Sequence, residues 1–257
     1  MKLEISILGC GWLGLPLASY LVNMGIVVKG SVTSLDKLEK LKSKNIIPYI
    51  VDINTEGNDL SDFLHSEILI ISIPSKIFNN FKSLIGHIEV SKIKKVLFIS
   101  STSVYSNSNQ IVTEETQVKD SLLSEIEILF RSSPLFETSI IRFGGLFGYD
   151  RKPGNFITKV KKIENPEGFV NLIHRDDCIQ IIHQIVINDI WGEIFNACAD
   201  THPSRRDFYT KENLKLGREE LIFNENALNS YKIISSNKLK SMLGFTFKYS
   251  DLLNYHE

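Results

Sequence analysis

The sequence predicts an α/β fold in which a doubly wound parallel sheet is joined to a small C-terminal lobe. Strand-like and helix-like segments alternate through most of the chain with short connections, as in successive β-α-β units. Residues 68–73 are almost all apolar, which is typical of a central parallel strand buried on both faces. A glycine-rich turn separates the first strand from the first helix.

The first half of the chain follows this alternation closely. Alternating apolar residues in 3–8 predict the first strand, and leucines four residues apart in 13–25 predict the first helix. Hydrophobic runs and periodic leucines or isoleucines predict the elements that follow. Further strands are expected at 26–32, 46–51, 68–73, 96–100 and 139–143, and further helices at 36–44, 76–88 and 121–130.

The second half is less regular. Strands are expected at 169–173 and 193–198, and helices at about 177–188, 204–216 and 237–243. Gly217 and Gly244 follow the last two helices, where a C-terminal cap belongs. No repeat, low-complexity segment or long linker separates these elements, so the smaller lobe is expected to be interleaved with the sheet.

The turn after the first strand has the spacing Gly-x-Gly-x-x-Gly, with glycines at 9, 11 and 14. Gly9 permits a tight turn, Gly11 lets the backbone approach phosphates, and Gly14 lets the helix lie close to the strand. The loop would hold a dinucleotide diphosphate at the positive N-terminus of the helix. A glycine-rich turn without a ligand is the alternative. The candidate cofactor-binding residues here are Gly9, Cys10, Gly11, Trp12, Leu13 and Gly14.

These features predict two parts of the chain with different roles. Residues 1–150, completed by 169–199, are expected to form the dinucleotide-binding core. Residues 151–168 and 200–257 are expected to form the smaller lobe on the substrate side.

Composition narrows the range of partners. The net charge is −1 and lysines are scattered among glutamates, so nucleic acid is not an expected partner. No apolar run is long enough to span a bilayer and the N-terminus lacks a signal-peptide pattern, so we expect no membrane contact and a cytoplasmic location. The three cysteines are far apart and the histidines lack ligand spacing, which predicts reduced thiols and no metal site. A small-molecule substrate and a monomer or homodimer are expected.

The second predicted strand carries the evidence on cofactor choice. Residues 30–35 lack the acid that would bind the ribose hydroxyls of NAD. Thr33 and Ser34 offer hydroxyls, and Lys37 offers a nearby positive charge, which favours NADP. NAD remains the alternative, because these residues also suit an ordinary turn and helix N-cap.

Two further segments at strand ends are candidate cofactor contacts. Asp52 would accept a hydrogen bond from the adenine amino group, or it simply ends the third strand. Ligands bind at the carboxyl ends of parallel strands. The ribose or nicotinamide is therefore expected to contact the residues after the fourth strand, Ile73, Pro74 and Ser75.

The segment Ser100-Ser-Thr-Ser-Val-Tyr105 resembles the Ser-Ser-x-x-Val-Tyr signature of extended short-chain dehydrogenases/reductases, the NAD-dependent epimerase/dehydratase family. Residues 142–148, 170–177 and 195–197 resemble further family segments in the same order. The resemblance covers nearly the whole chain and implies a Rossmann-type fold that binds NAD or NADP. The glycine spacing at 9–14 departs from the commoner family form, which places the chain among atypical members.

The chain lacks the proton relay that the family uses. That relay is a tyrosine and a lysine four residues apart on one helix, where the lysine charge favours the tyrosinate. No tyrosine in the chain is followed by a lysine at that spacing, and residues 119–130 contain no tyrosine.

The resemblance nevertheless supplies candidate residues on the substrate side. Ser101 matches the catalytic Ser/Thr of the family and would bind a substrate oxygen, unless its hydroxyl is satisfied at the strand end. Tyr105 is a candidate proton donor, although this tyrosine is usually packed in the family. Arg142 and His174 have structural alternatives as a strand-end ion pair and a core histidine. The candidate substrate-binding residues are Thr102, Ser103, Arg142 and His174.

Three functional hypotheses follow. The first is an NAD(P)-dependent oxidoreductase, epimerase or dehydratase that acts on a sugar nucleotide or another small carbonyl or hydroxyl compound. The second is a catalytically silent NADP(H)-binding regulator, which the missing relay favours. The third is an enzyme like the β-hydroxyacid dehydrogenases, whose opening motif is similar, but the strands predicted after residue 168 argue against their long helical domain.

Overall fold

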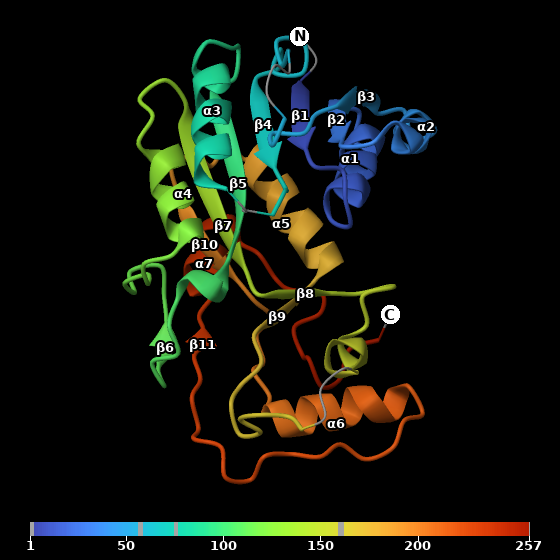
Figure 1. Ribbon diagram of the computed structural model, residues 1–257, viewed down its shortest axis with the longest axis vertical. Coiled ribbons are helices and arrows are strands. Elements are labelled where there is room, and N and C mark those ends of the chain that lie inside the picture. The colour runs from blue at the N-terminus through green and yellow to red at the C-terminus, as the bar shows by residue number, and fades with distance from the viewer. Residues whose placement is uncertain (1–2, 56–58, 75–76, 159–161, 257) are drawn as a thin grey trace. The chain divides into compact units, whose positions relative to one another are not determined.

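The computed structural model describes residues 3–55, 59–74, 77–158 and 162–256 (Figure 1). The chain forms two compact units, each assembled from three separate segments. Unit 1 consists of Met1–Ser100, Asp120–Ile141 and Ile182–Ile194, and unit 2 consists of Ser101–Lys119, Arg142–Ile181 and Phe195–Glu257. Among the described residues, no helix combines the length and apolar character that a membrane crossing requires.

A seven-stranded parallel sheet has the order β10-β7-β5-β4-β1-β2-β3, which confirms the predicted fold class. The order runs outward from β1 in both directions, so the sheet is doubly wound and reverses between β1 and β4. The strands are β1 (Glu4–Leu8), β2 (Val27–Val32), β3 (Ile47–Ile50), β4 (Ile68–Ile71), β5 (Lys95–Ser101), β7 (Glu137–Phe143) and β10 (Ile194–Ala197). All four residues of β4 are buried, as the apolar run predicted.

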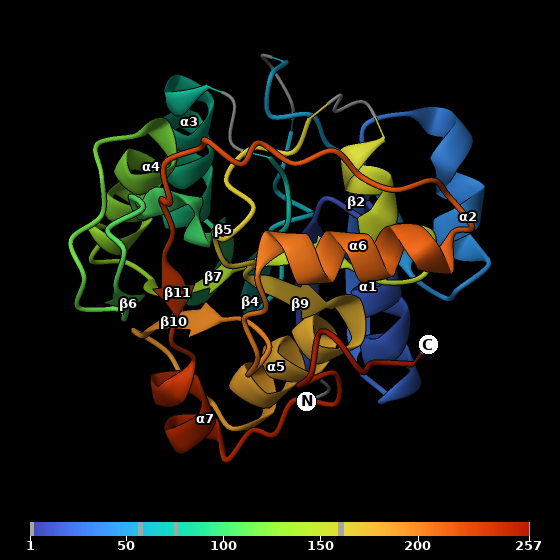
Figure 2. The ribbon, with the colours of Figure 1, turned by 90° about the horizontal axis from the view of Figure 1, so that it is seen from below.

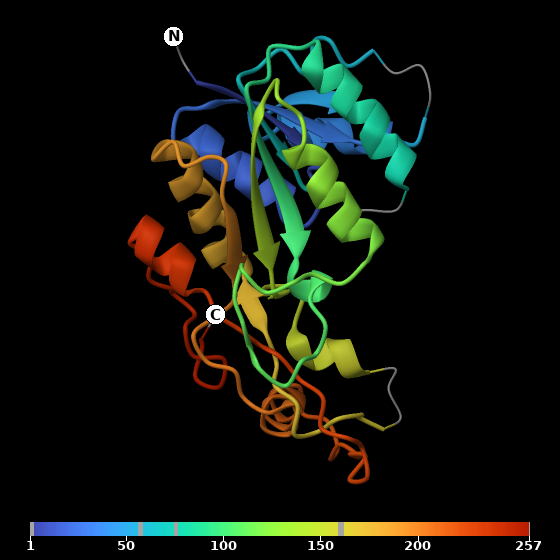
Figure 3. The same ribbon diagram turned by 90° about the vertical axis from the view of Figure 1, so that its left-hand side faces the viewer.

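Helices cover both faces of the strands in unit 1. In Figure 3, α3 and α4 lie side by side on one face, and α1 lies on the other. These helices are α1 (Gly14–Asn23), α2 (Leu38–Lys42), α3 (Phe78–Glu89) and α4 (Leu122–Arg131). Ser121 caps α4 through a reciprocal capping box with Ser124, which fixes where that helix begins.

Aromatic side chains fill the space beneath α3 and α4. The ring of Phe98 on β5 stacks on Phe130 of α4, with ring centroids 5.1 Å apart. Phe81 of α3 meets both rings edge-on. All three side chains are no more than 1% exposed, so this cluster anchors both helices to the sheet.

Unit 2 contains two small parallel sheets and a second core. β6 (Ile111–Val112) pairs with β11 (Ile233–Ile234), and β8 (Gly145–Phe147) pairs with β9 (Leu172–His174). The short 3₁₀ helix η3 (Pro153–Ile157) packs against α6 (Arg205–Lys215), as Figure 2 shows from below. The remaining α-helices of the described residues are α5 (Arg175–Ile187), which both units share, and α7 (Asn237–Leu243).

Two predicted elements differ from those in the structure, and three short strands were not predicted. The strand predicted at 169–173 is β9, which lies at 172–174 and pairs with β8 outside the main sheet. The helix predicted at 36–44 is a 3₁₀ turn, η1 (Leu35–Lys37), followed by the five-residue α2. The short strands β6, β8 and β11 were not predicted, because two or three residues are too few to show a hydrophobic period.

The unit boundaries also differ from the predicted domain boundaries. Of the residues expected in the dinucleotide-binding core, 101–119, 142–150, 169–181 and 195–199 belong to unit 2. The pairings β6 with β11 and β8 with β9 hold the first two of these segments against residues much later in the chain. The expected division by function stays a prediction.

Candidate functional site

The three glycines of the loop after β1 occupy three different environments. Gly9 has φ +98°, and a Cβ there would lie 2.5 Å from Ile73 and 2.7 Å from the carbonyl oxygen of Ser72. A Cβ on Gly14 would overlap the carbonyl oxygen of Gly9. A Cβ on Gly11 would meet nothing within 4 Å. Two glycines are therefore required by the fold, whereas the third leaves open space beside the loop.

The first two backbone N–H groups of the loop are bound to β2. The N–H of Gly9 donates to the hydroxyl of Ser31 at 3.0 Å, and the N–H of Cys10 donates to the Ser31 carbonyl at 2.7 Å. Within the described part of the chain, the N–H groups of Gly11 and Leu13 make no hydrogen bond. They lie at the N-terminus of α1, where the helix dipole is positive, so they suit an anion.

Cys10 and Trp12 differ in how far they reach the surface. Burial raises the pKa of the Cys10 thiol to about 12, although a backbone hydrogen bond with Ser31 lowers it, so the thiol stays neutral. Its sulfur packs where a Cβ on Gly30 would lie, 2.7 Å away. A ligand could therefore contact only the backbone of Cys10. The Trp12 side chain is half-buried, so part of it reaches the surface.

A hollow of about 370 Å³ lies at the carboxyl ends of β1 to β4 in unit 1. Four predicted cofactor contacts line it, namely Thr33, Asp52, Ile73 and Pro74. The remaining lining is mostly apolar, from Leu8, Val51, Ile53, Ile77 and Phe81, with Asn54 as a further polar group. Apolar walls with a few polar groups are typical of a site for a small molecule or cofactor.

Asp52 is oriented by its neighbours at the edge of this hollow. Its Oδ1 accepts hydrogen bonds from the backbone N–H of Asn54 at 3.0 Å and from the Asn54 side chain at 2.6 Å. The Asn54 side-chain oxygen in turn accepts from Asn80 on α3 at 2.7 Å. The carboxylate is therefore held in one orientation.

Ser34 and Lys37 do not line the hollow. Ser34 is half-buried before η1 and makes no side-chain cap hydrogen bond, and Lys37 is exposed. The predicted contact Ser75 lies outside the described residues.

The Ser-Ser-Thr-Ser-Val-Tyr segment begins at the end of β5. The Ser101 hydroxyl accepts a hydrogen bond from the backbone N–H of Ser103 at 3.1 Å and caps the short 3₁₀ helix η2 (Thr102–Val104). Ser101 is half-buried, Ser103 is exposed and Thr102 is 6% exposed.

Tyr105 and Arg142 form a buried pair in unit 2. Arg142 donates to the Tyr105 oxygen at 2.6 Å, and the Tyr105 hydroxyl donates to Asn196 at 3.0 Å. Tyr105 is 1% exposed and Arg142 is 4% exposed. Burial raises the pKa of the Tyr105 phenol despite the lowering effect of Arg142. Their burial favours a positioning role over the predicted contacts with substrate.

His174 is also buried, at 0% exposure. Its ring lies 3.6 Å from that of Tyr249, centroid to centroid, and 5.2 Å from that of Phe147. Its Nδ1 accepts a hydrogen bond from the N–H of Asp176 at 3.2 Å. This environment favours the structural alternative, a core histidine beside the start of α5, over the predicted substrate contact.

The buried carboxylate of Glu127 on α4 was not predicted from the sequence. The Ser100 hydroxyl donates to Glu127 at 2.5 Å, and the two residues are 6% and 2% exposed. Glu127 lies on the helix where the family's tyrosine and lysine would be expected. It shares the apolar face of that helix with Ile126 and Phe130, and an acid at such a position is the signal that would have revealed it.

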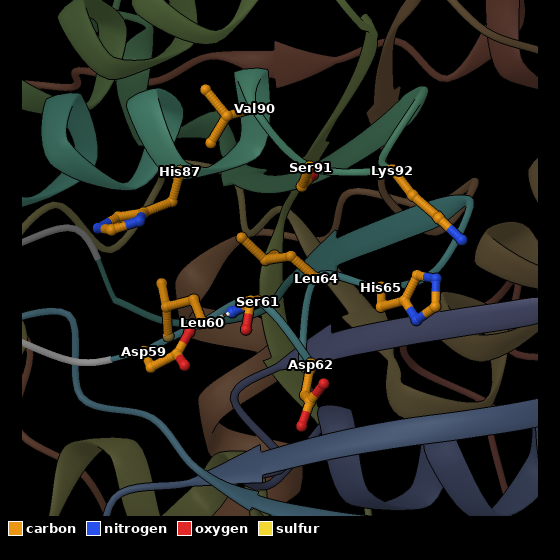
Figure 4. Close-up of a pocket in the computed structure, with 10 residues that line it drawn as sticks. All are labelled: Asp59, Leu60, Ser61, Asp62, Leu64, His65, His87, Val90, Ser91 and Lys92. Carbon is orange, nitrogen blue, oxygen red and sulfur yellow. Dashed lines mark hydrogen bonds between the residues drawn. The ribbon is translucent and has the colours of Figure 1, made fainter.

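A second hollow in unit 1, of about 650 Å³, lies at the opposite ends of the strands from the first hollow (Figure 4). Residues 59–65 precede β4 and residues 87–92 precede β5, so this hollow lies at the amino ends of the strands. None of the predicted site residues lines it.

Comparison with known proteins gives relatives in both sequence and structure. A comparison with family models finds no match. Protein YeeZ of Escherichia coli strain K12 is 32% identical over 269 residues, covering 97% of each chain.

Two solved structures share the fold. A protein from Methylobacillus flagellatus, described as an NAD-dependent epimerase/dehydratase, has a TM-score of 0.77 at 21% identity and covers 98% of this chain and 95% of its own. The UDP-glucuronic acid 4-epimerase of Bacillus cereus, in complex with NAD, has a TM-score of 0.76 at 17% identity with the same coverage.

Proposed function

Because the chain belongs to the family of Escherichia coli YeeZ and has the fold of the NAD-dependent epimerase/dehydratase proteins, we propose that it is an NAD(P)-dependent enzyme that acts on a sugar nucleotide. The reaction would be an oxidation–reduction, epimerisation or dehydration. The observation that carries the proposal is the glycine loop, where two N–H groups and the space beside Gly11 suit a diphosphate.

The residues present fit a dinucleotide. The N–H groups of Gly11 and Leu13 would bind its diphosphate, and the hollow beside Asp52 and Ile73 would hold its adenosine half. When bound, the nicotinamide supplies a hydride donor or acceptor. The apolar hollow excludes water from the adenine, and the fixed carboxylate of Asp52 would orient it.

NADP is the proposed preference over NAD. Thr33 lies at the rim of the hollow, and Lys37 is exposed on the turn that follows β2. No acid stands in residues 30–35, so a 2′-phosphate would meet hydroxyls and a positive charge. A Lys37→Glu variant tests this preference, because it should weaken NADPH binding and leave NADH binding unchanged.

On the substrate side, Ser101 is the proposed group that orients the reacting oxygen. Its hydroxyl accepts from Ser103, which leaves its proton as a donor toward substrate. Thr102 and Ser103 belong to the same short helix and are proposed as further substrate contacts. The proton donor is not Tyr105 in this proposal, because that phenol is buried between Arg142 and Asn196.

The burial of the Tyr105 phenol favours a second function. A chain without the tyrosine–lysine relay, whose remaining candidate tyrosine is inaccessible, suits a sensor that binds NADP(H) without turnover. The third hypothesis, an enzyme like the β-hydroxyacid dehydrogenases, gains no support. The helices among the described residues after β10 are the short α6 and α7, and they do not form a long helical domain.

The experiment has two stages. Thermal unfolding with NAD, NADH, NADP and NADPH should show stabilisation for an enzyme and for a sensor alike. Turnover on a panel of sugar nucleotides and small carbonyl compounds then separates the two. Ser101→Ala should abolish that turnover, whereas Ser106→Ala at an exposed neighbouring position should preserve it. Stabilisation without any turnover would establish the sensor, and no stabilisation by any dinucleotide would refute both.

A further inference from the structure

Tyr149 has a backbone conformation that its residue type rarely adopts. Its φ is +57°, in the left-handed region. The other non-glycine residues with positive φ in the described chain are asparagines and one aspartate, which tolerate this region. Tyr149 follows Gly148 in a tight turn closed by two hydrogen bonds between Gly148 and Arg151. A bulky aromatic residue at such a position is strained, and strain of this kind gathers at functional sites.

The side chain of Tyr149 is held in place by its neighbours on α5. Its hydroxyl donates to Asp176 at 2.8 Å, and the guanidinium of Arg175 lies 3.9 Å from the centre of its ring. Asp176 is itself held by the hydroxyl of Tyr249 and by Lys248, each at 3.4 Å. The ring of His174 also lies 5.6 Å from that of Tyr149, centroid to centroid, so the ring is held by three neighbours.

Despite these contacts, Tyr149 remains 47% exposed. A packing role would bury the ring, as it does for Tyr105 and Tyr249, which are 1% and 7% exposed. A rigid, half-exposed aromatic ring beside a guanidinium suits the stacking of a flat heteroaromatic ring. The strained backbone of Tyr149 is explained if the turn has to hold this ring at the surface.

We propose that Tyr149 and Arg175 form a platform on which the nucleobase of a sugar-nucleotide substrate stacks. This inference rests on the proposed function, since it names how the substrate of that site is bound. The guanidinium of Arg175 lies over the ring, and Arg151 is an exposed residue of the same turn. Guanidinium groups bind phosphate oxygens well. The adenine of a dinucleotide is assigned to the hollow in unit 1, so the base on Tyr149 comes from the substrate.

The test is calorimetric titration of the full chain with UDP and, separately, with ADP. Three proteins are compared: the parent, Tyr149→Phe and Tyr149→Asn. Tyr149→Phe keeps the ring and should bind UDP within about threefold of the parent, whereas Tyr149→Asn removes the ring and should bind about tenfold or more weakly. Asparagine tolerates a positive φ, so Tyr149→Asn should unfold at or above the temperature of the parent.

The outcomes separate this inference from the proposed function. Stabilisation by NADPH or NADH with no UDP binding to the parent would refute the platform and leave the proposed function standing. Unchanged UDP affinity in Tyr149→Asn would also refute the platform. Weaker ADP binding in Tyr149→Asn, with unchanged UDP binding, would show that the ring serves the cofactor instead. Failure of every dinucleotide to stabilise the chain would refute the proposed function itself.

Discussion

The side-chain oxygen of Ser31 accepts a hydrogen bond from the backbone N–H of Gly9 at 3.0 Å, although the two residues are 22 positions apart. Ser31 is 1% exposed, and its carbonyl accepts the N–H of Cys10 as well. One residue of β2 thus anchors the first two N–H groups of the glycine loop. The later N–H groups, those of Gly11 and Leu13, are left to face a ligand.

Replacement of Ser31 by alanine should loosen this loop. The N–H of Gly9 would lose its partner in a buried place, which costs about 1–3 kcal/mol of unfolding free energy. Urea unfolding measures that loss, and titration with NADPH and NADH should show weaker binding. Ser106→Ala is the matched control, because Ser106 is exposed and is not a candidate cofactor contact. Equal stability and affinity in the two variants would contradict this role for Ser31.

Replacement of Gly14 by alanine should disturb the fold itself. The new Cβ would overlap the Gly9 carbonyl, so α1 must move away from the loop, at a cost of about 1–3 kcal/mol. Gly86→Ala on α3 is the control, because a Cβ there meets nothing within 4 Å. That variant should gain about 0.5–1 kcal/mol through better helix propensity. A Gly14→Ala protein as stable as the parent would show that the close approach of α1 is not required.

The Tyr105→Phe variant distinguishes positioning from proton transfer. Loss of the hydroxyl removes two buried hydrogen bonds, one from Arg142 and one to Asn196, so the unfolding free energy should fall by about 1–3 kcal/mol. Turnover at a temperature where the variant is folded should stay within about threefold of the parent. If turnover vanished while stability was unchanged, the phenol would be the proton donor.

His183 on α5 should make stability depend on pH. It is 8% exposed, meets Tyr20 edge-on with centroids 5.2 Å apart, and burial lowers its pKa. Below about pH 6.5 the unfolded chain binds a proton that the folded chain resists, so stability falls as the pH falls below that value. Above it both states are neutral and this effect vanishes.

The measurement is urea unfolding of the parent, His183→Leu and His65→Leu between pH 8 and pH 5. The decline should be smaller in His183→Leu, because the unfolded chain then takes up one proton fewer. His65 is exposed, so His65→Leu should retain the full decline of the parent. A decline of equal size in all three proteins would show that His183 does not contribute.

The parts of the fold that could be predicted are those with a strong local pattern. β1 and α1 were predicted within one or two residues because apolar spacing and glycine position both marked them, and β4 because of its apolar run. The roles of Gly9 and Gly14 also agree with the geometry, since each meets backbone atoms that exclude a side chain. The pairing of β8 with β9 was missed, because contacts between distant short segments leave no period in the sequence.

The buried residues of the candidate site were harder to predict. A motif shows which residue types are present, but it does not show whether they are buried. Three residues with functional groups that suit catalysis are buried in the structure, namely Tyr105, Arg142 and His174. Their burial depends on partners such as Asn196 and Tyr249, which lie far along the chain. Tyr149 was missed for a related reason, because a positive φ at a tyrosine is a property of the folded turn.

The binding of a dinucleotide at the glycine loop is tested most directly by Gly11→Leu. Nothing lies within 4 Å of the Cβ that this change adds, so the free energy of unfolding measured with urea should match that of the parent within about 0.5 kcal/mol. The added side chain would occupy the space of the diphosphate, so affinity for NADPH and NADH should fall by at least about tenfold. A folded Gly11→Leu protein that binds either nucleotide as tightly as the parent would contradict the account.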